Sequence, residues 1–74
     1  MSTQTDIRTA VAEVSKRPLL SITSSSRLTE DLGIRSIQRV ELAVLLGEKL
    51  GREVRDEQVM VSKTVGDLEL KLGA

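Results

Sequence analysis

The sequence contains no cysteine, no histidine and no aromatic residue. Without Cys or His it has no disulfides, and it lacks the groups that most often bind metals or act as nucleophiles and general bases. Without aromatic rings it also lacks the platforms on which nucleic-acid bases stack. We therefore predict a protein that is not an enzyme, has no metal site and has no nucleic-acid partner.

Charge of either sign is not in excess, because 11 Lys and Arg residues balance 11 Asp and Glu residues. A net charge of zero gives no electrostatic reason to expect binding to nucleic acid or to an anionic membrane. No apolar run approaches the length of a membrane span, and the first residues lack the basic start and apolar run of a signal peptide. We expect a soluble, cytoplasmic protein without membrane insertion.

A chain of 74 residues and 8.1 kDa has room for one domain with a modest core, which here must be built from aliphatic side chains and Met. The prediction is a single domain over residues 1–74 with an ordered core over about 5–72. A deep, enclosed active site is not expected, and we expect a monomer.

Apolar spacing predicts a first helix over residues 5–16, whose stripe is Ile7, Ala10, Val11 and Val14. Thr3 and Asp6 have the spacing of a capping box, and Pro18 cannot continue the helix. A serine-rich segment follows over residues 18–35. It is unusually long for a loop in so small a domain. Its apolar residues predict an ordered loop packed on the core, with a turn near 29–32; they are Leu19, Leu20, Ile22, Leu28, Leu32 and Ile34.

The strongest helical pattern covers residues 36–50, with Ser36 as a suitable N-cap and Gly51 as a left-handed C-cap. Its expected core stripe is Ile37, Val40, Val44 and Leu45, widened by Leu42, Leu46 and Leu50. This arc is wide enough to predict a central helix that contacts several others.

Two shorter segments complete the predicted fold. Acidic residues open a one-turn helix near residues 56–59. Thr64 and Asp67 form a capping-box pair for a last helix, although residues 68–72 also alternate as a strand would. We favour the helix, so the predicted class is all-α: a small four-helix bundle with a long first loop and a short third helix.

Ser36 stands where the loop meets the longest helix, after Gly33, which permits a sharp turn. The first amides of a helix lack intrahelical partners and its dipole is positive there, so a phosphodiester on Ser36 would be favourably placed. Leu32, Ile34 and Ile37 are predicted to anchor the chain on both sides. On position alone, an ordinary N-cap is the favoured interpretation of Ser36.

Residues 28–42, LTEDLGIRSIQRVEL, resemble the attachment segment of acyl carrier proteins. That family has a Glu-Asp-Leu-Gly run, then Asp-Ser-Leu, then Val-Glu-Leu. Glu30–Gly33, Ser36 and Val40–Leu42 stand at the same relative spacing. The similarity extends over residues 5–72 and includes the start of the last helix.

The resemblance implies a bundle of acyl-carrier type in which Ser36 carries 4'-phosphopantetheine as a covalent cofactor. A phosphopantetheinyl transferase using magnesium would attach it from coenzyme A. The arm would hold an acyl, aminoacyl or peptidyl intermediate as a thioester. Acyl-loading and acyl-processing enzymes of a fatty acid, polyketide or other specialised pathway would be the partners, and the carrier itself would catalyse nothing.

This sequence departs from the family pattern beside Ser36, with Arg35 in place of Asp, Ile37 in place of Leu, and Gln38 and Arg39 where acids are usual. We predict a partner interface made of Arg35, Ile37, Arg39, Glu41 and Glu48. Its mixed charge favours clients different from those of primary fatty acid synthesis. A second interpretation is that charge varies freely on an exposed helix, and a third is that the loss of Asp prevents modification.

Four residues could line a channel that shelters an acyl chain: Val40, Val44, Leu45 and Met60. The competing interpretation is that they are ordinary core residues. The alternative function for the whole chain is an unmodified helical adaptor with a degenerate carrier fold.

Overall fold

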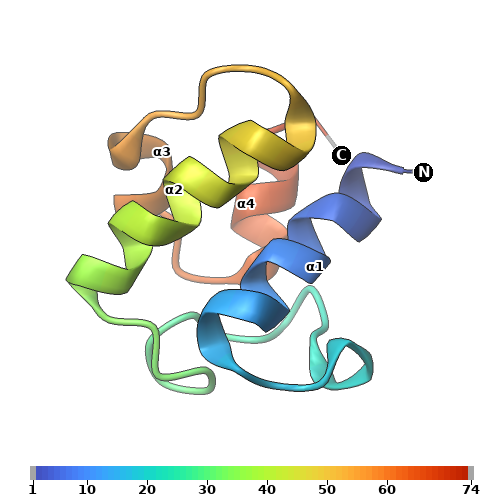
Figure 1. Ribbon diagram of the computed structural model, residues 1–74. Helices are drawn as coiled ribbons and strands as arrows, with labels where there is room; N and C mark the ends of the chain where they lie inside the picture. The colour runs from blue at the N-terminus through green and yellow to red at the C-terminus, as the bar shows by residue number, and fades with distance from the viewer. Residues whose placement is uncertain (1, 74) are drawn as a thin grey trace.

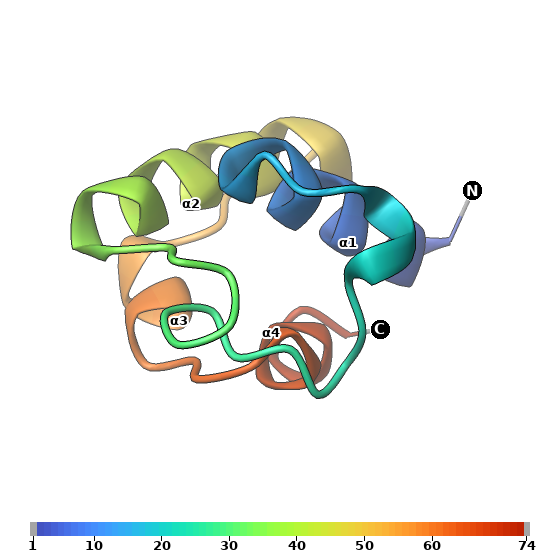
Figure 2. The same cartoon turned by 90° about the horizontal axis from the view of Figure 1, so that it is seen from below.

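The computed structural model describes residues 2–73, which form four α-helices and one short 3-10 helix. The elements are α1 (Thr3–Ser15), η1 (Leu19–Ser21), α2 (Ser36–Leu50), α3 (Asp56–Met60) and α4 (Val65–Lys71). Figure 1 shows α1 and α2 side by side, and Figure 2 shows that α3 and α4 form a second layer beneath them. No strand occurs within residues 2–73, so the predicted all-α four-helix fold is confirmed.

The core lies between these two layers and is aliphatic throughout. Each of the four helices contributes to it, and so does the long loop between α1 and α2. The largest fully buried apolar side chains are Ile7, Leu28, Ile34, Leu42, Leu46, Leu68, Val11, Val59 and Val65. Across residues 2–73, no helix is both long and apolar enough to cross a membrane.

The first helix begins earlier than its sequence pattern indicates. Its N-cap is Ser2, whose hydroxyl accepts a hydrogen bond from the Thr5 amide at 3.1 Å. The predicted cap at Thr3 is therefore wrong, because Thr3 is already the first residue of α1 and the Ser2 hydroxyl makes the capping bond. The predicted end is confirmed: α1 stops at Ser15, and Lys16 follows in the left-handed conformation.

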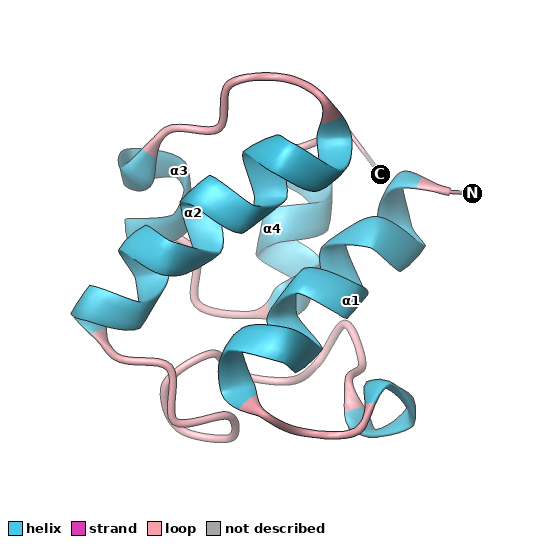
Figure 3. Ribbon diagram, in the orientation of Figure 1, coloured by secondary structure: helices cyan, strands magenta, loops and turns pink. Residues whose placement is uncertain are grey.

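The loop from residue 16 to residue 35 is ordered by contacts with the start of α4. Leu28 donates its amide to the Lys63 carbonyl at 2.9 Å, and the Ser26 carbonyl accepts from the Val65 amide at 3.0 Å. The predicted turn is present over residues 28–32, and η1 is an additional element (Figure 3). Leu19 and Leu20 are not the core anchors predicted, since they are 43% and 97% exposed.

The second helix has the predicted bounds but presents a different face to the core. Its buried residues are Leu42, Ala43 and Leu46. The predicted stripe is largely on the outside, because Ile37, Val40 and Val44 are 77%, 39% and 60% exposed. The prediction failed because α2 is apolar on two sides, and spacing alone does not say which side meets the other helices. The predicted left-handed Gly51 is confirmed at φ 67°.

The two short helices form as predicted. In α3 the Gln58 side chain accepts a hydrogen bond from the Arg55 amide at 3.0 Å. At α4 the capping box is complete: Thr64 Oγ1 accepts from the Asp67 amide, and Asp67 Oδ2 accepts from the Thr64 amide, both at 3.1 Å. The strand interpretation of residues 68–72 is wrong, since the cap fixes the helical start.

Candidate functional site

Ser36 is the first residue of α2, and its side chain is exposed. The N-cap is Arg35, so the interpretation of Ser36 as an N-cap is wrong. Instead, the Gln38 side chain accepts a hydrogen bond from the Arg35 amide at 3.0 Å. Ser36 Oγ takes part in none of the side-chain hydrogen bonds found within residues 2–73. The hydroxyl is therefore exposed to solvent and does not stabilise the start of the helix.

The turn before Ser36 positions this hydroxyl. Gly33 has a φ of 67°, a left-handed conformation that favours glycine, and its amide donates to the Thr29 carbonyl at 3.0 Å. The next residue, Ile34, is fully buried and donates its amide to the Leu28 carbonyl at 2.8 Å. The chain is thus fixed in the core two residues before Ser36. It is not anchored after Ser36 as predicted, because Ile37 is exposed.

The same turn is held by an ion pair between Arg27 and Asp31. The Arg27 side chain, which approaches Asp31 Oδ1 at 3.1 Å, lowers the pKa of that carboxyl below its ordinary value, and the Arg27 amide lowers it further. Asp31 therefore stays ionised and holds the turn. Both the amide and the side chain of Arg27 donate hydrogen bonds to the Asp31 carboxylate. Asp31 therefore binds within this turn and not at Ser36.

The start of α2 suits an attached phosphodiester. The first amides of an α-helix have no intrahelical acceptor, and those of residues 36–38 form none of the loop or cap hydrogen bonds found within residues 2–73. No acidic side chain occupies the first turn of α2, so nothing there opposes the negative charge that the helix dipole favours. The residues present fit a phosphopantetheine on Ser36.

Four of the five residues predicted for a partner interface are exposed along or beside the outer face of α2. They are Arg35, Ile37, Glu41 and Glu48. None of these charged groups joins the ion pairs found in the described residues. Glu41 and Glu48 flank the exposed Ile37 and Val44 at helical spacing. The interface itself stays a prediction.

Arg39 differs from the other four because its guanidinium is directed inward. Nη1 donates to the backbone carbonyls of Val59 and Ser62, each at 2.7 Å, at the C-terminal end of α3. Nη2 donates to the Thr29 hydroxyl at 3.0 Å, and that hydroxyl donates to the Ile34 carbonyl at 3.0 Å. The sequence pattern did not predict this role because the acceptors lie up to 23 positions from Arg39 along the chain.

The hydrogen bond from the Arg35 amide to Gln38 could have been predicted, because a Gln three residues after the N-cap position is typical of a capping box.

Three of the four predicted channel residues are exposed at the surface. Val40, Val44 and Met60 are 39%, 60% and 41% exposed. Leu45 is half-buried against the core, four residues before Lys49, which pairs with Glu13 of α1 at 3.2 Å. Leu45 therefore lies on the side of α2 that faces α1. The channel stays a prediction for the loaded protein.

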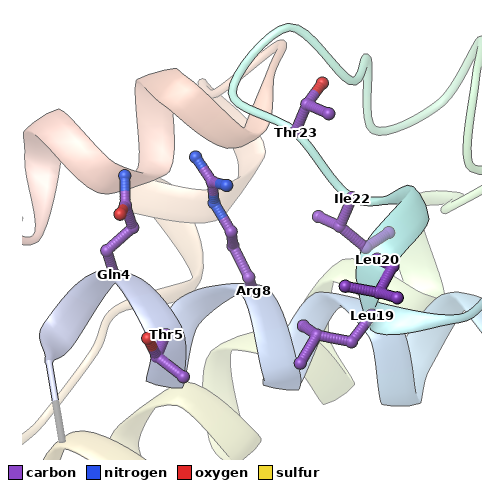
Figure 4. A pocket seen from close by; sticks show the side chains of 7 residues that line it. All are labelled: Gln4, Thr5, Arg8, Leu19, Leu20, Ile22 and Thr23. Atoms are coloured by element: carbon purple, nitrogen blue, oxygen red, sulfur yellow. The ribbon is translucent and has the colours of Figure 1, made fainter.

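The structure does contain a surface pocket of about 320 Å³, between α1 and the segment around η1 (Figure 4). None of the predicted site residues lines it. Its lining is Gln4, Thr5, Arg8, Leu19, Leu20, Ile22 and Thr23.

Comparison with known proteins identifies relatives over most of the chain. Residues 5–71 match the family model described as "Phosphopantetheine attachment site". The chain is 36% identical over 63 residues to the acyl carrier protein of Helicobacter pylori, covering 85% of this chain and 81% of that protein. It is 36% identical to the acyl carrier protein of Wolinella succinogenes, covering 85% and 83%. For the acyl carrier protein of Thermobifida fusca, the identity is 34% over 58 residues, covering 78% and 73%.

Proposed function

This chain belongs to the acyl carrier protein family, and we propose that Ser36 is its attachment residue. The family membership makes it a carrier of acyl groups on 4'-phosphopantetheine rather than a catalyst. The observation that supports Ser36 is its exposed hydroxyl at the start of α2, which makes no side-chain hydrogen bond within residues 2–73. When attached, the phosphopantetheine supplies a thiol that holds the cargo as a thioester.

The carried group is an acyl, aminoacyl or peptidyl intermediate of a fatty acid, polyketide or other specialised pathway. A specialised pathway is supported by the surface around Ser36, where Arg35 adds a positive charge and Ile37 and Val44 expose apolar area. Complementary partners would offer an apolar contact with mixed charge, because like charges brought together at an interface reject wrong partners.

The remaining assignments follow from this role. The partners are a phosphopantetheinyl transferase and the enzymes that load and process the cargo. We propose that the carrier works as a cytoplasmic monomer and presents Ser36 to these enzymes from the outer face of α2.

The test is intact-mass analysis after incubation with coenzyme A, magnesium and a broad-specificity phosphopantetheinyl transferase. We expect the protein to gain the mass of one phosphopantetheine and Ser36→Ala to gain nothing. Ser25→Ala is the matched control, since Ser25 is also exposed but lies in the loop, and it should be modified normally. An unmodified wild-type chain would support the helical adaptor instead.

A further inference from the structure

The turn that precedes Ser36 is fixed at Ile34 through both of its backbone polar groups. The Ile34 amide donates to the Leu28 carbonyl at 2.8 Å, and the Ile34 carbonyl accepts from the Thr29 hydroxyl at 3.0 Å. The Ile34 side chain is fully buried. Figure 2 shows this turn running directly into the start of α2. The position of the Ser36 hydroxyl therefore depends on how firmly Ile34 and its bonds are held.

Arg39 lies one helical turn after Ser36 on α2 and holds the preceding turn from two directions. Its amide donates to the carbonyl of the N-cap Arg35 at 2.9 Å. Its guanidinium Nη2 donates to the Thr29 hydroxyl at 3.0 Å, and this is the hydroxyl that binds the Ile34 carbonyl. The residues directly before Ser36 are thus tied to Arg39, one through its backbone and the other through its side chain.

The guanidinium of Arg39 is itself fixed by bonds to the end of α3. Nη1 donates to the Val59 and Ser62 carbonyls at 2.7 Å each, and hydrogen bonds from a charged donor are stronger than neutral ones. Arg39 takes part in none of the ion pairs found within residues 2–73. Because a guanidinium is planar and presents its donors at fixed angles, the bonds of Nη1 also fix Nη2 against Thr29.

We propose that Arg39 is a positioning residue for the attachment reaction, in which it holds Thr29 and Ile34 so that the Ser36 hydroxyl keeps one orientation. This inference rests on the proposed attachment at Ser36. In that reaction the Ser36 oxygen bonds to the phosphorus of coenzyme A that carries the pantetheine. The pyrophosphate bond breaks, adenosine bisphosphate leaves, and the hydroxyl proton passes to a base of the transferase. A nucleophile held in place speeds such a step.

The first measurement is the kinetics of phosphopantetheinylation, with the carrier varied at saturating coenzyme A. In Arg39→Met, kcat should fall about tenfold, while KM for the carrier should stay within about twofold of the wild-type value. A loss of stability alone would give the opposite pattern. An unfolded fraction lowers the effective concentration of the carrier, which raises KM and leaves kcat at saturation unchanged. An unchanged kcat in Arg39→Met would overturn the proposal.

Arg39→Lys separates position from charge. The ammonium keeps the positive charge but lacks the planar fork of donors, so it should recover only part of the lost kcat. Full recovery would mean that the transferase responds to the charge, and the positioning role would be overturned. Arg55→Met is the matched control, since Arg55 is exposed and outside the ion pairs of the described residues. It should keep the wild-type kcat, and an equal fall in both Met variants would also contradict the proposal.

Thr29→Val tests the route from Arg39 to the attachment turn. Val has a similar shape but lacks the hydroxyl that links the guanidinium to the Ile34 carbonyl. Thr29→Val should lower kcat, and the double variant should be no slower than Arg39→Met alone, because both changes remove the same link. If the two losses multiplied, the residues would act independently and the route would be wrong. Thr29→Val also carries the kinetic test if Arg39→Met does not fold.

The last measurement uses the unmodified protein and separates this proposal from attachment at Ser36. Hydrogen exchange at the Ile34 amide, which bonds to the Leu28 carbonyl, should be about tenfold faster in Arg39→Met and Thr29→Val than in the wild type. Equal exchange would overturn the positioning role even if Ser36 is modified. A wild-type chain that gains no phosphopantetheine would overturn the attachment, and with it the part that Arg39 plays in the reaction.

Discussion

Gly33 controls the backbone turn that delivers the chain to Ser36. Its φ of 67° is accessible to other residues only with strain, although an added Cβ would meet no atom within 4 Å. Gly33→Ala should therefore cost about 1 kcal/mol in the free energy of unfolding, from backbone strain alone. Because the strain falls three residues before Ser36, the substitution should also slow phosphopantetheinylation, measured as kcat/KM of a transferase.

Gly51 provides the control for this prediction at the other end of α2. It has the same φ of 67° and the same free space for a Cβ. Gly51→Ala should lose similar stability in denaturant unfolding but should be modified at the wild-type rate. If both variants were modified at equal rates, the conformation of Gly33 would matter only to stability and not to the presentation of Ser36.

At the scale of the secondary-structure elements, α2 is apolar on two sides. Its inner side builds the core, whereas Ile37 and Val44 are exposed on its outer side. Exposed apolar residues contribute little to folding but can contribute strongly at the centre of an interface. Ile37→Ser should leave the free energy of unfolding nearly unchanged. It should lower kcat/KM of the transferase about tenfold, which corresponds to about 1.4 kcal/mol.

Leu20→Ser is the matched control for this surface prediction. Leu20 is 97% exposed but belongs to η1 and not to α2, so the same loss of apolar surface occurs away from the attachment helix. We expect Leu20→Ser to be modified at the wild-type rate. A similar loss of rate in both variants would indicate nonspecific contact rather than docking on the outer face of α2.

Element bounds could be predicted where local chemistry decides them. The C-cap at Gly51 and the capping box at Thr64 both depend on residues within one turn, and both appear as predicted. The first residue of α1 could not be predicted in this way. Ser2 and Thr3 are both residue types that cap helices, and Thr3 has the capping-box spacing to Asp6, but the N-cap in the structure is Ser2.

Features that depend on distant contacts could not be predicted. Nothing in the local pattern explains Gly47 inside α2, but in the structure a Cβ there would lie 3.0 Å from the Arg52 carbonyl oxygen. Glycine allows the chain after α2 to pass close to the helix. The inward course of Arg39 has the same origin, because its acceptors lie on α3 and beyond. Charge pattern alone placed Arg39 on the partner surface.

At the scale of the whole molecule, a buried carboxylate joins three separate parts of the chain. Glu69 of α4 is buried and pairs with Arg8 of α1, with 2.8 Å between Oε2 and Nε. Its other oxygen accepts a hydrogen bond from Ser24 of the long loop at 2.9 Å. Arg8 also donates to Ser24 at 2.8 Å, which closes the network. The loop that precedes the attachment segment is thereby fastened to both layers.

This network should make stability depend on pH. Burial alone would raise the pKa of Glu69, but the hydrogen bonds from Arg8 and Ser24 outweigh it and hold the pKa below the ordinary value of 4.5. A carboxyl with a lowered pKa in the folded state contributes stability at pH values above its unfolded pKa. That contribution disappears as the pH falls through the folded pKa. The wild type should therefore lose stability in acid, where Glu69 becomes protonated.

Glu69→Gln separates this contribution from the rest of the acid response. At pH 7 the variant should unfold with about 1–2 kcal/mol less free energy, because it retains an acceptor but loses the charge that Arg8 requires. In urea titrations carried out at successively lower pH, the difference from the wild type should shrink below pH 4.5. Glu53→Gln is the control, since Glu53 is exposed and outside the ion pairs of the described residues. A constant difference at every pH would mean that Glu69 acts through packing, because only an ionised carboxylate makes the link between α1, the loop and α4 sensitive to protons.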